Sequence, residues 1–435
     1  MTSAHHLTAT LRAALLLMVV GVGCRARSEA PVAIEFWAMG SEGERVQRLL
    51  AEFERQTPGV RVHVQQIPWS AAHEKLLTAY VGDAMPDLFQ VGNTWIPEFV
   101  ALNAVEPLDE RMAHSFVLQK EDYFPGILDT NVIGGALYGV PWYVDTRVLF
   151  YRTDLLQEAG IRLPPATWDA WLDAMLRIKA GGGRDAYAIL LPMTEWQPPV
   201  ILALQRGARL LRDDDQYGNF RSPEFRGAFQ FYLDLFHHDL APRDADAQVA
   251  NLYQDFANGY FAFYITGPWN IGEFQQRLPA AMTGKWATAP MPAPDATHSG
   301  ISTAGGASLA LCRGSRHRDA AWQVIEFLST PARQSEFYRL TGDLPSRKTA
   351  WMQQDLMHDR YAQAFWQQLQ HVQATPKIPE WERIADKITQ YAEAAIRGRM
   401  DTDAALTALD ADVDQVLEKR RWLLRRGADA ERARP

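Results

Sequence analysis

The sequence predicts an α/β protein built as two domains, and three observations carry this prediction. The chain has 435 residues, more than one core usually organises, since single cores rarely grow beyond about 250–300 residues. Hydrophobic residues make up 47% and charged residues 22%, as in a folded globular chain. Short β-prone runs alternate with amphipathic helical patterns, the order typical of sheets covered by helices.

The first two dozen residues predict export. Arg12 precedes the apolar stretch Ala13–Gly23, 11 residues long, whereas a membrane-spanning helix needs about 20. Residues 1–23 are therefore predicted to be a signal peptide. The following Cys24 completes a pattern that resembles a bacterial lipobox, although Gly21 stands where leucine is usual. We expect acylation of Cys24 and an extracytoplasmic, membrane-anchored protein in the periplasm or at the cell surface; the alternative is plain secretory cleavage a few residues later.

The first elements of the mature chain alternate strand, helix, strand. A helix beginning with a capping box at Ser41 and Glu44 is expected between two strands and to end at Pro58-Gly59. The predicted strands are Val32–Trp37, Val60–Gln65 and Asp87–Val91. Parallel sheets bind ligands beyond the carboxyl ends of their strands, so the loops after Trp37 and Val91 are candidate ligand loops.

The rest of the chain continues this alternation and becomes mainly helical in its last third. Helix starts are expected at Thr167, at Ser222-Pro223 and at Thr330-Pro331, where capping or first-turn residues precede apolar stripes. Further strands are predicted at Tyr260–Ile265 and Ser308–Cys312. The glycines at 181–183 end a helix, because no strand leads into them as a phosphate-binding loop requires.

Composition excludes several classes of function. The net charge of −8 makes nucleic acid an improbable partner. The chain has two cysteines, and with Cys24 acylated, Cys312 is expected to be a buried, inert thiol. His237 and His238 form no metal-ligand pattern, so neither a metal nor another cofactor is expected. The motifs G-x-S-x-G and H-E-x-x-H and the P-loop are absent from the sequence.

Aromatic residues in predicted loops favour a sugar ligand. A pyranose ring has an apolar face that flat aromatic rings cover, while carboxylates, amides and arginines bond its hydroxyls. The tryptophans in predicted loops or at strand ends are Trp37, Trp69, Trp196 and Trp269. Stacking on a ligand and packing beneath a loop remain equally open for each of them.

Six segments in order resemble the extracytoplasmic sugar-binding proteins of ABC importers, in the group of the maltose- and trehalose-binding receptors. The resemblance covers nearly the whole mature chain. The segments are Phe53–Val62, Pro86–Trp95, Tyr138–Leu156, Pro164–Trp171, Gly267–Asn270 and Thr303–Leu311.

This resemblance implies the two-lobe fold of periplasmic binding proteins, with an interlobe cleft and hinge crossings. The first lobe would comprise residues 31–142 and 305–344, and the second residues 143–304 and 345–424. The last residues, 425–435, are expected to be a frayed basic tail.

The resemblance also implies ligand-contacting residues. Glu42 and Asn93 match polar residues after the first and third strands, and Tyr143 and Asp145 match a pair on a crossing segment. Purely structural roles also stay open: Glu42 could act only by stabilising the dipole of its helix, and Asp145 could form an ion pair with Arg147 that braces the hinge. The remaining matched positions are a stacking aromatic at Trp269, a close backbone approach at Gly305-Gly306 and a cleft arginine at Arg347.

The expected function is therefore the substrate-binding component of an ABC transporter, a monomer that delivers a mono- to oligosaccharide to permease subunits. Two alternatives remain. Loop tryptophans and acidic residues also describe a secreted hydrolase of carbohydrates, which needs two carboxylates flanking the bond. A receptor for a glycerol phosphodiester would need more cationic groups in the cleft than Arg347 and Arg147 supply.

Overall fold

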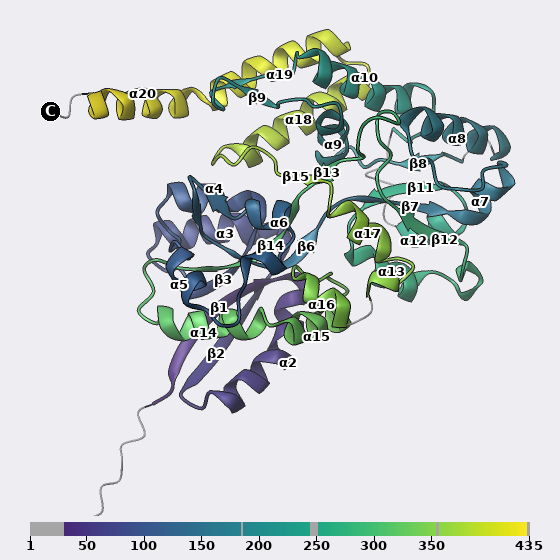
Figure 1. Cartoon of the computed structure of the whole chain (residues 1–435). Helices are drawn as coiled ribbons and strands as arrows, with labels where there is room; N and C mark the ends of the chain where they lie inside the picture. Colours follow the sequence, from purple (N-terminus) through teal and green to yellow (C-terminus); the bar gives the residue numbers. More distant parts are fainter. Residues whose placement is uncertain (1–29, 184–185, 244–250, 354–355, 433–435) are drawn as a thin grey trace, which may run out of the picture.

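The computed structural model describes residues 30–183, 186–243, 251–353 and 356–432. The predicted signal peptide at 1–23 and the acylation site Cys24 lie outside the described residues. Two α/β lobes lie side by side, joined by segments that cross between them (Figure 1). The predicted two-lobe fold is confirmed.

The first lobe is built on a five-stranded mixed sheet with the order β2-β1-β3-β14-β6. Strand β1 runs parallel to β2 and β3, whereas β14 is antiparallel to β3 and β6. The strands are β1 (Val32–Met39), β2 (Val60–Ile67), β3 (Leu88–Gly92), β6 (Val140–Asp145) and β14 (Gly305–Leu311). The loops after β1 and β3 therefore leave the same edge of the sheet, as the sequence predicted.

Helices cover both faces of this sheet. On one face the apolar stripes of α2 (Gly40–Gln56), α14 (Arg318–Leu328) and α15 (Pro331–Thr341) share a core with β1. On the other face α3 (Trp69–Val81) and α4 (Ile96–Ala101) pack against β3. Cys312 is a free thiol, 6% exposed, in this second core.

The second lobe has a four-stranded sheet with the order β12-β7-β11-β8. Its strands are β7 (Val148–Arg152), β8 (Ile189–Leu190), β11 (Phe263–Thr266) and β12 (Trp286–Ala289). Its main core is closed by α8 (Trp168–Gly181), α9 (Gln197–Gln205), α10 (Pro223–His237), α18 (Trp381–Ile396) and α19 (Thr402–Val416).

A third apolar cluster lies where the two lobes meet. It joins Phe124 and Ile127 of the first lobe to Phe150 of β7, with Trp351 between them. Trp351 makes an edge contact with Phe124 at 5.9 Å between ring centroids. The crossings are therefore packed against a common core.

The first crossing begins slightly later than the predicted boundary at 142/143. Residues Tyr143, Val144 and Asp145 still pair with β14 as part of the first sheet. The chain leaves that sheet at Thr146 and enters the second at Val148. The remaining elements are β4 (Val132–Ile133), β5 (Ala136–Leu137), β9 (Leu211–Arg212), β10 (Tyr217–Gly218), β13 (Ser302–Thr303), β15 (Val372–Gln373), α5 (Asp109–His114), α6 (Pro125–Asp129), α7 (Thr153–Glu158), α12 (Leu252–Ala257), α13 (Trp269–Arg277), α16 (Lys348–Gln353), α17 (Gln363–Gln368) and α20 (Glu418–Arg432).

Three of the predicted helix starts are confirmed by their caps. The hydroxyls of Thr167, Ser222 and Thr330 each accept a hydrogen bond from the backbone N–H three residues on. The predicted capping box at Ser41 and Glu44 is wrong. Helix α2 begins at Gly40, so Ser41 is already inside it and donates to the Glu42 carboxylate instead, at 3.3 Å.

The predicted frayed tail at 425–435 is also wrong over most of its length. Helix α20 runs from Glu418 to Arg432 and extends away from the second lobe (Figure 1). Among the described residues, no helix is both long and apolar enough to cross a membrane.

Candidate ligand-binding cleft

A cavity of about 710 Å³ lies between the lobes and brings together eight of the nine predicted ligand-contacting residues. The first lobe contributes the loops after β1 and β3 and the end of β6. The second lobe contributes the starts of α9 and α13 and the first turn of α18. The eight residues are Glu42, Trp69, Asn93, Tyr143, Asp145, Trp269, Gly305 and Gly306.

Glu42 is held in place by two donors from distant parts of the first lobe. Its Oε1 accepts from the indole Nε1 of Trp69 at 3.1 Å and from the hydroxyl of Tyr143 at 2.8 Å. Gln90 donates in turn to that hydroxyl at 2.9 Å. Gly40, with φ +52°, makes the turn, and a Cβ there would collide with both Glu42 and Trp69. Glu42 thus presents a fixed, 7% exposed carboxylate to the cavity.

The sequence predicted Trp69 and Trp269 to lie in loops or at strand ends, and the structure places both in helices. Each is the first residue of a helix, α3 and α13 respectively, with its side chain 37% exposed. Trp37 lies within β1, under the ammonium of Lys75, and does not line the cavity. Trp196 does line it, directly before α9.

Asp145, Arg147 and Trp269 form a stacked unit where the chain crosses from the first lobe to the second. Arg147 donates from Nη1 to Asp145 Oδ1, and its guanidinium lies 4.7 Å from the centroid of the Trp269 ring. Atoms Cε3, Cζ3 and Cη2 of the ring lie against Gly267, where any Cβ would overlap them. Arg147 is 7% exposed and its Nε has no partner among the described residues. Asp145 therefore braces Arg147, the alternative left open by the sequence, while also facing the cavity.

Asn93 and the Gly305-Gly306 pair are constrained by the first lobe itself. Asn93 donates to Thr130 and accepts from Ser308, both at 2.8 Å. Gly306 has φ +141°, and a Cβ there would lie 2.2 Å from the carbonyl oxygen of Tyr143. Glycine is required at this position by the pairing of β14 with β6, independently of any ligand.

Sequence reasoning missed several residues that line the cleft. Three of them, Thr94, Trp95 and Thr303, lie within segments that resemble the family, but the others share no motif and come from segments far apart in the chain. The missed residues are Thr94, Trp95, Gln197, Tyr253, Glu273, Arg277, Thr303, Thr341, Asp343 and Glu382.

Two of the missed carboxyls lie in environments that disfavour their charge. Burial raises the pKa of Asp343 well above its usual value, and the nearby Glu42 carboxylate raises it further. Burial also raises the pKa of Glu382, although a hydrogen bond with Thr94 and the charge of His73 partly oppose this. Glu273, by contrast, is paired with Arg277 at 2.5 Å.

We expect Asp343→Asn to stabilise the ligand-free protein at neutral pH by about 1–3 kcal/mol, the usual cost of a buried group without compensation. Because the pKa of Asp343 is higher in the folded state, the folded protein binds the extra proton, and stability falls as pH rises from about 4. The gain should therefore shrink towards zero near pH 4. Thermal melts of both proteins at several pH values measure it; a gain independent of pH would contradict the assignment.

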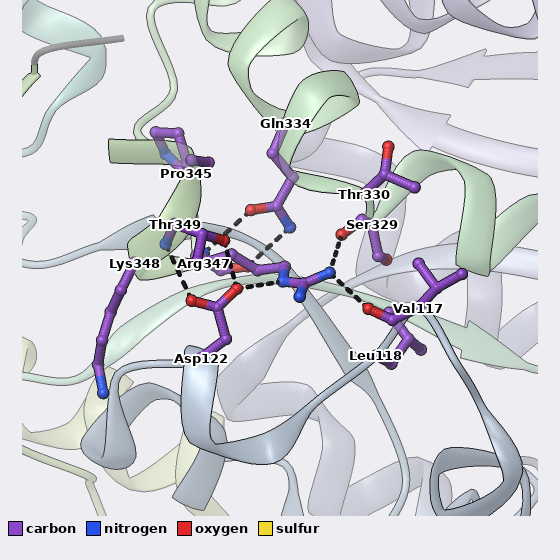
Figure 2. A network of polar contacts seen from close by, with 12 residues as sticks. Val117, Leu118, Asp122, Ser329, Thr330, Gln334, Pro345, Arg347, Lys348 and Thr349 are labelled. Atoms are coloured by element: carbon purple, nitrogen blue, oxygen red, sulfur yellow. Dashed lines mark hydrogen bonds and ion pairs between the residues drawn. The ribbon is translucent and has the colours of Figure 1, made fainter. Parts of the chain in front are cut away.

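Arg347, the ninth predicted residue, does not line the cleft, and its assignment as a ligand contact is wrong. Its Nε donates to Asp122 at 2.6 Å, and its Nη1 donates to the carbonyls of Val117 and Ser329 at 2.8 and 3.1 Å (Figure 2). The Arg347 and Asp122 side chains are only 5% and 8% exposed. The guanidinium points into the first lobe because this buried carboxylate is its partner there.

The Arg347 network fixes the last crossing to the first lobe. Asp122 also accepts from the backbone N–H and the hydroxyl of Thr349, at 2.9 and 2.5 Å (Figure 2). Gln334 accepts from the backbone N–H of Arg347 at 3.0 Å. The segment that follows Asp343 is thus locked in place, which positions the Asp343 carboxyl at the cavity wall.

Comparison with known proteins places this architecture in a family. The model of the family "Bacterial extracellular solute-binding protein" matches residues 39–335. The chain belongs to this family. The family's extracellular character agrees with the export predicted from the first residues, and its members' two lobes match those of the structure.

Several proteins that this chain resembles are described as sugar-binding. The sugar-binding protein MalE of Xanthomonas citri is 48% identical, covers 91% of this chain and 99% of its own, and superposes with a TM-score of 0.87. A solute-binding protein of Thermotoga lettingae, bound to α-D-tagatose, is 25% identical over 89% of this chain and 100% of its own, with a TM-score of 0.76. The diacetylchitobiose-binding protein DasA of Streptomyces coelicolor is 28% identical over 85% of this chain and 86% of its own.

Proposed function

We propose that this protein captures a sugar in the interlobe cleft and delivers it to the permease of an ABC importer. The observation that carries the proposal is the meeting, in one cavity, of carboxylates and aromatic rings from both lobes. Glu42 and Trp69 come from the first lobe, and Trp196 and Trp269 from the second. A ligand bound by both sides favours the closed arrangement of the lobes.

Each side of the cleft offers a different part of the recognition. On the first-lobe side, Glu42 presents carboxylate oxygens to sugar hydroxyls, Asn93 lines the cleft with its amide held by Thr130 and Ser308, and Gly305-Gly306 allow close approach to the backbone. From the second lobe, the exposed part of the Trp269 ring covers a pyranose face, and Asp145, at the end of the first-lobe strand β6, faces the same cavity. Carboxylate acceptors are suited to hydroxyl donors, because charged hydrogen bonds are about twice as strong as neutral ones.

The cleft chemistry supports a neutral sugar over a phosphodiester. Its two arginines are each paired with a carboxylate, Arg147 with Asp145 and Arg277 with Glu273. Glu42, Asp343 and Glu382 line the same cavity without a paired cation among the described residues. An anionic ligand would face these carboxyls.

The proposal includes a monomeric receptor without catalytic activity, held at the membrane by acyl chains on Cys24. The sequence before Cys24 supports the anchor, and mass spectrometry of the purified membrane fraction tests it. A peptide from the mature N-terminus that carries acyl chains is the expected result. If the mature protein instead begins after residue 24 with an unmodified N-terminus, it is secreted without a lipid anchor.

Isothermal titration calorimetry of the protein against a panel of mono- to oligosaccharides tests the main proposal. Saturable binding without product formation is expected for at least one sugar. Release of shorter sugars, followed by chromatography of the same samples, would instead indicate a hydrolase. Binding of glycerol phosphodiesters in place of every neutral sugar would overturn the sugar assignment.

Trp269→Ala should weaken sugar binding about 10–100-fold, since it removes the stacking surface and leaves the Arg147 guanidinium without its ring. Trp422→Ala is the matched control, because Trp422 is 49% exposed and does not line the cleft. Titrations of both variants with the best sugar measure the effect. If Trp269→Ala binds the sugar with the affinity of the parent, Trp269 does not contact the ligand.

A further inference from the structure

Helix α20 carries an exposed surface that the sugar-binding cleft does not use. Its first residues are fixed to the second lobe: Arg420 donates to the carbonyl of Asp215 at 3.1 Å, and Arg421 donates to those of Gln216 and Asp414 at 2.8 and 2.7 Å. Beyond this base the helix extends away from the body of the protein (Figure 1). Its direction is therefore set by the lobe, and its distal turns project beyond the other elements in that view.

The composition of this projecting helix is unlike that of the rest of the chain. Residues 419–426 hold five basic side chains and no acidic one, in a protein whose net charge is −8. Lys419, Arg425 and Arg426 are exposed. A positive surface has thus been placed on the projecting element of an acidic protein.

Three large apolar side chains lie among these charges. These consecutive residues are Trp422, Leu423 and Leu424, which are 49%, 52% and 45% exposed. Few other large apolar side chains in the described structure are as exposed to solvent. The Arg426 guanidinium lies 4.7 Å from the centroid of the Trp422 ring. Consecutive residues on a helix point about 100° apart, so these three spread over about 200° of the helix circumference, between the basic side chains.

We propose that α20 binds the surface of an anionic phospholipid membrane. Arginine and lysine bind lipid phosphates, tryptophan favours the headgroup region, and leucine enters the acyl boundary. The basic side chains of the helix complement the charge of such a surface, and the exposed apolar side chains among them add apolar area that can be buried there. The contact would orient the second lobe relative to the membrane, independently of the cleft and of any acyl chain on Cys24.

Sedimentation with lipid vesicles tests this proposal on protein expressed from residue 25 onward, which carries no acyl chain and keeps the whole folded body from Ala30. The vesicles are of phosphatidylcholine, with or without about one third phosphatidylglycerol. Binding is expected only to the anionic vesicles, and raising the salt from about 0.05 M to 0.5 M should abolish it.

The variant Lys419→Gln/Arg425→Gln/Arg426→Gln should lose at least about 10-fold in partitioning to anionic vesicles, because each basic side chain near such a surface contributes to binding. It leaves Arg420 and Arg421, which fix the helix base, unchanged. The control Arg48→Gln/Arg162→Gln/Arg316→Gln removes the same charge from exposed sites elsewhere and should bind as the parent does.

Sugar titration and thermal melting of both triple variants should match the parent, which separates this proposal from the proposed function. Absence of binding by the parent, equal binding to both vesicle types, or equal losses in the two variants would overturn the proposal. If the parent does not bind vesicles but dimerises with increasing concentration, and only the α20 variant loses this dimerisation, the proposal is overturned and the partner of α20 is a second copy of the chain.

Discussion

Arg347→Met should lower the free energy of unfolding by about 3–5 kcal/mol, the range expected when one member of a buried ion pair is removed. The variant leaves the Asp122 carboxylate, 8% exposed, without its cation, and it also removes the donors to the carbonyls of Val117 and Ser329. Denaturant unfolding followed by fluorescence measures the change. The same loss should appear as a clear drop in the melting temperature.

Arg333→Met is the matched control for this prediction. Arg333 lies on α15, pairs with Glu52 and Glu336, and has a side chain 20% exposed, so its pairs face solvent more than the Arg347 pair does. We expect a loss of about 1 kcal/mol or less. Combining Arg347→Met with Asp122→Leu should recover part of the stability, since no uncompensated buried charge remains. A large fall in sugar affinity with unchanged stability would contradict this account and return Arg347 to the cleft.

Asp145→Ala should weaken sugar binding about 100-fold or more, which corresponds to about 3 kcal/mol. Two effects combine: the ligand loses a charged acceptor, and Arg147 loses the carboxylate that holds its guanidinium over Trp269. Arg147 is 7% exposed, and Glu195 would then be the carboxylate among the described residues that still balances its charge. Calorimetric titration with the best sugar measures the loss.

Asp173→Ala serves as the control for Asp145→Ala. Asp173 also pairs with an arginine, Arg177, at 2.8 Å, but on the exposed face of α8. Its loss should leave sugar affinity unchanged. Asp145→Asn helps to separate the two effects, because an amide can still accept from Arg147 and from a hydroxyl but carries no charge; its affinity should fall between those of the parent and Asp145→Ala. If Asp145→Ala binds sugar with the affinity of the parent, the proposed binding site is wrong, although the family assignment still holds.

The side chains that the sequence located in the cleft are mostly those tied to local structure. Glu42 and Asn93 directly follow strands of one parallel set, and parallel strands deliver their following loops to the same edge of a sheet. Tyr143 and Asp145 belong to the longest segment with family resemblance. Trp69 and Trp269 were identified although their local structure was not, because each begins a helix at a strand-to-helix junction.

The missed and misassigned residues depend on contacts between distant segments. Glu382 reaches the cavity because α18 of the second lobe packs near Thr94 of the first, 288 positions earlier in the numbering. Arg347 was expected to reach the ligand because it follows Pro345 and Ser346 on the last crossing, but its partner Asp122 is 225 residues away. No periodicity or residue spacing within the sequence predicts either contact.

The amino-acid sequence by itself determined the α/β class, the two lobes and the edge of the first sheet that holds the ligand loops. These follow from length, hydrophobic periodicity and residue type, which act locally along the chain. Tertiary structure alone decided that Arg347 is a buried brace, that Asp343 and Glu382 line the cleft, and that the basic C-terminal residues extend a helix. The physical reason is that the burial and pairing of a charged side chain depend on which distant segment lies opposite it, and folding sets that arrangement for the whole chain at once.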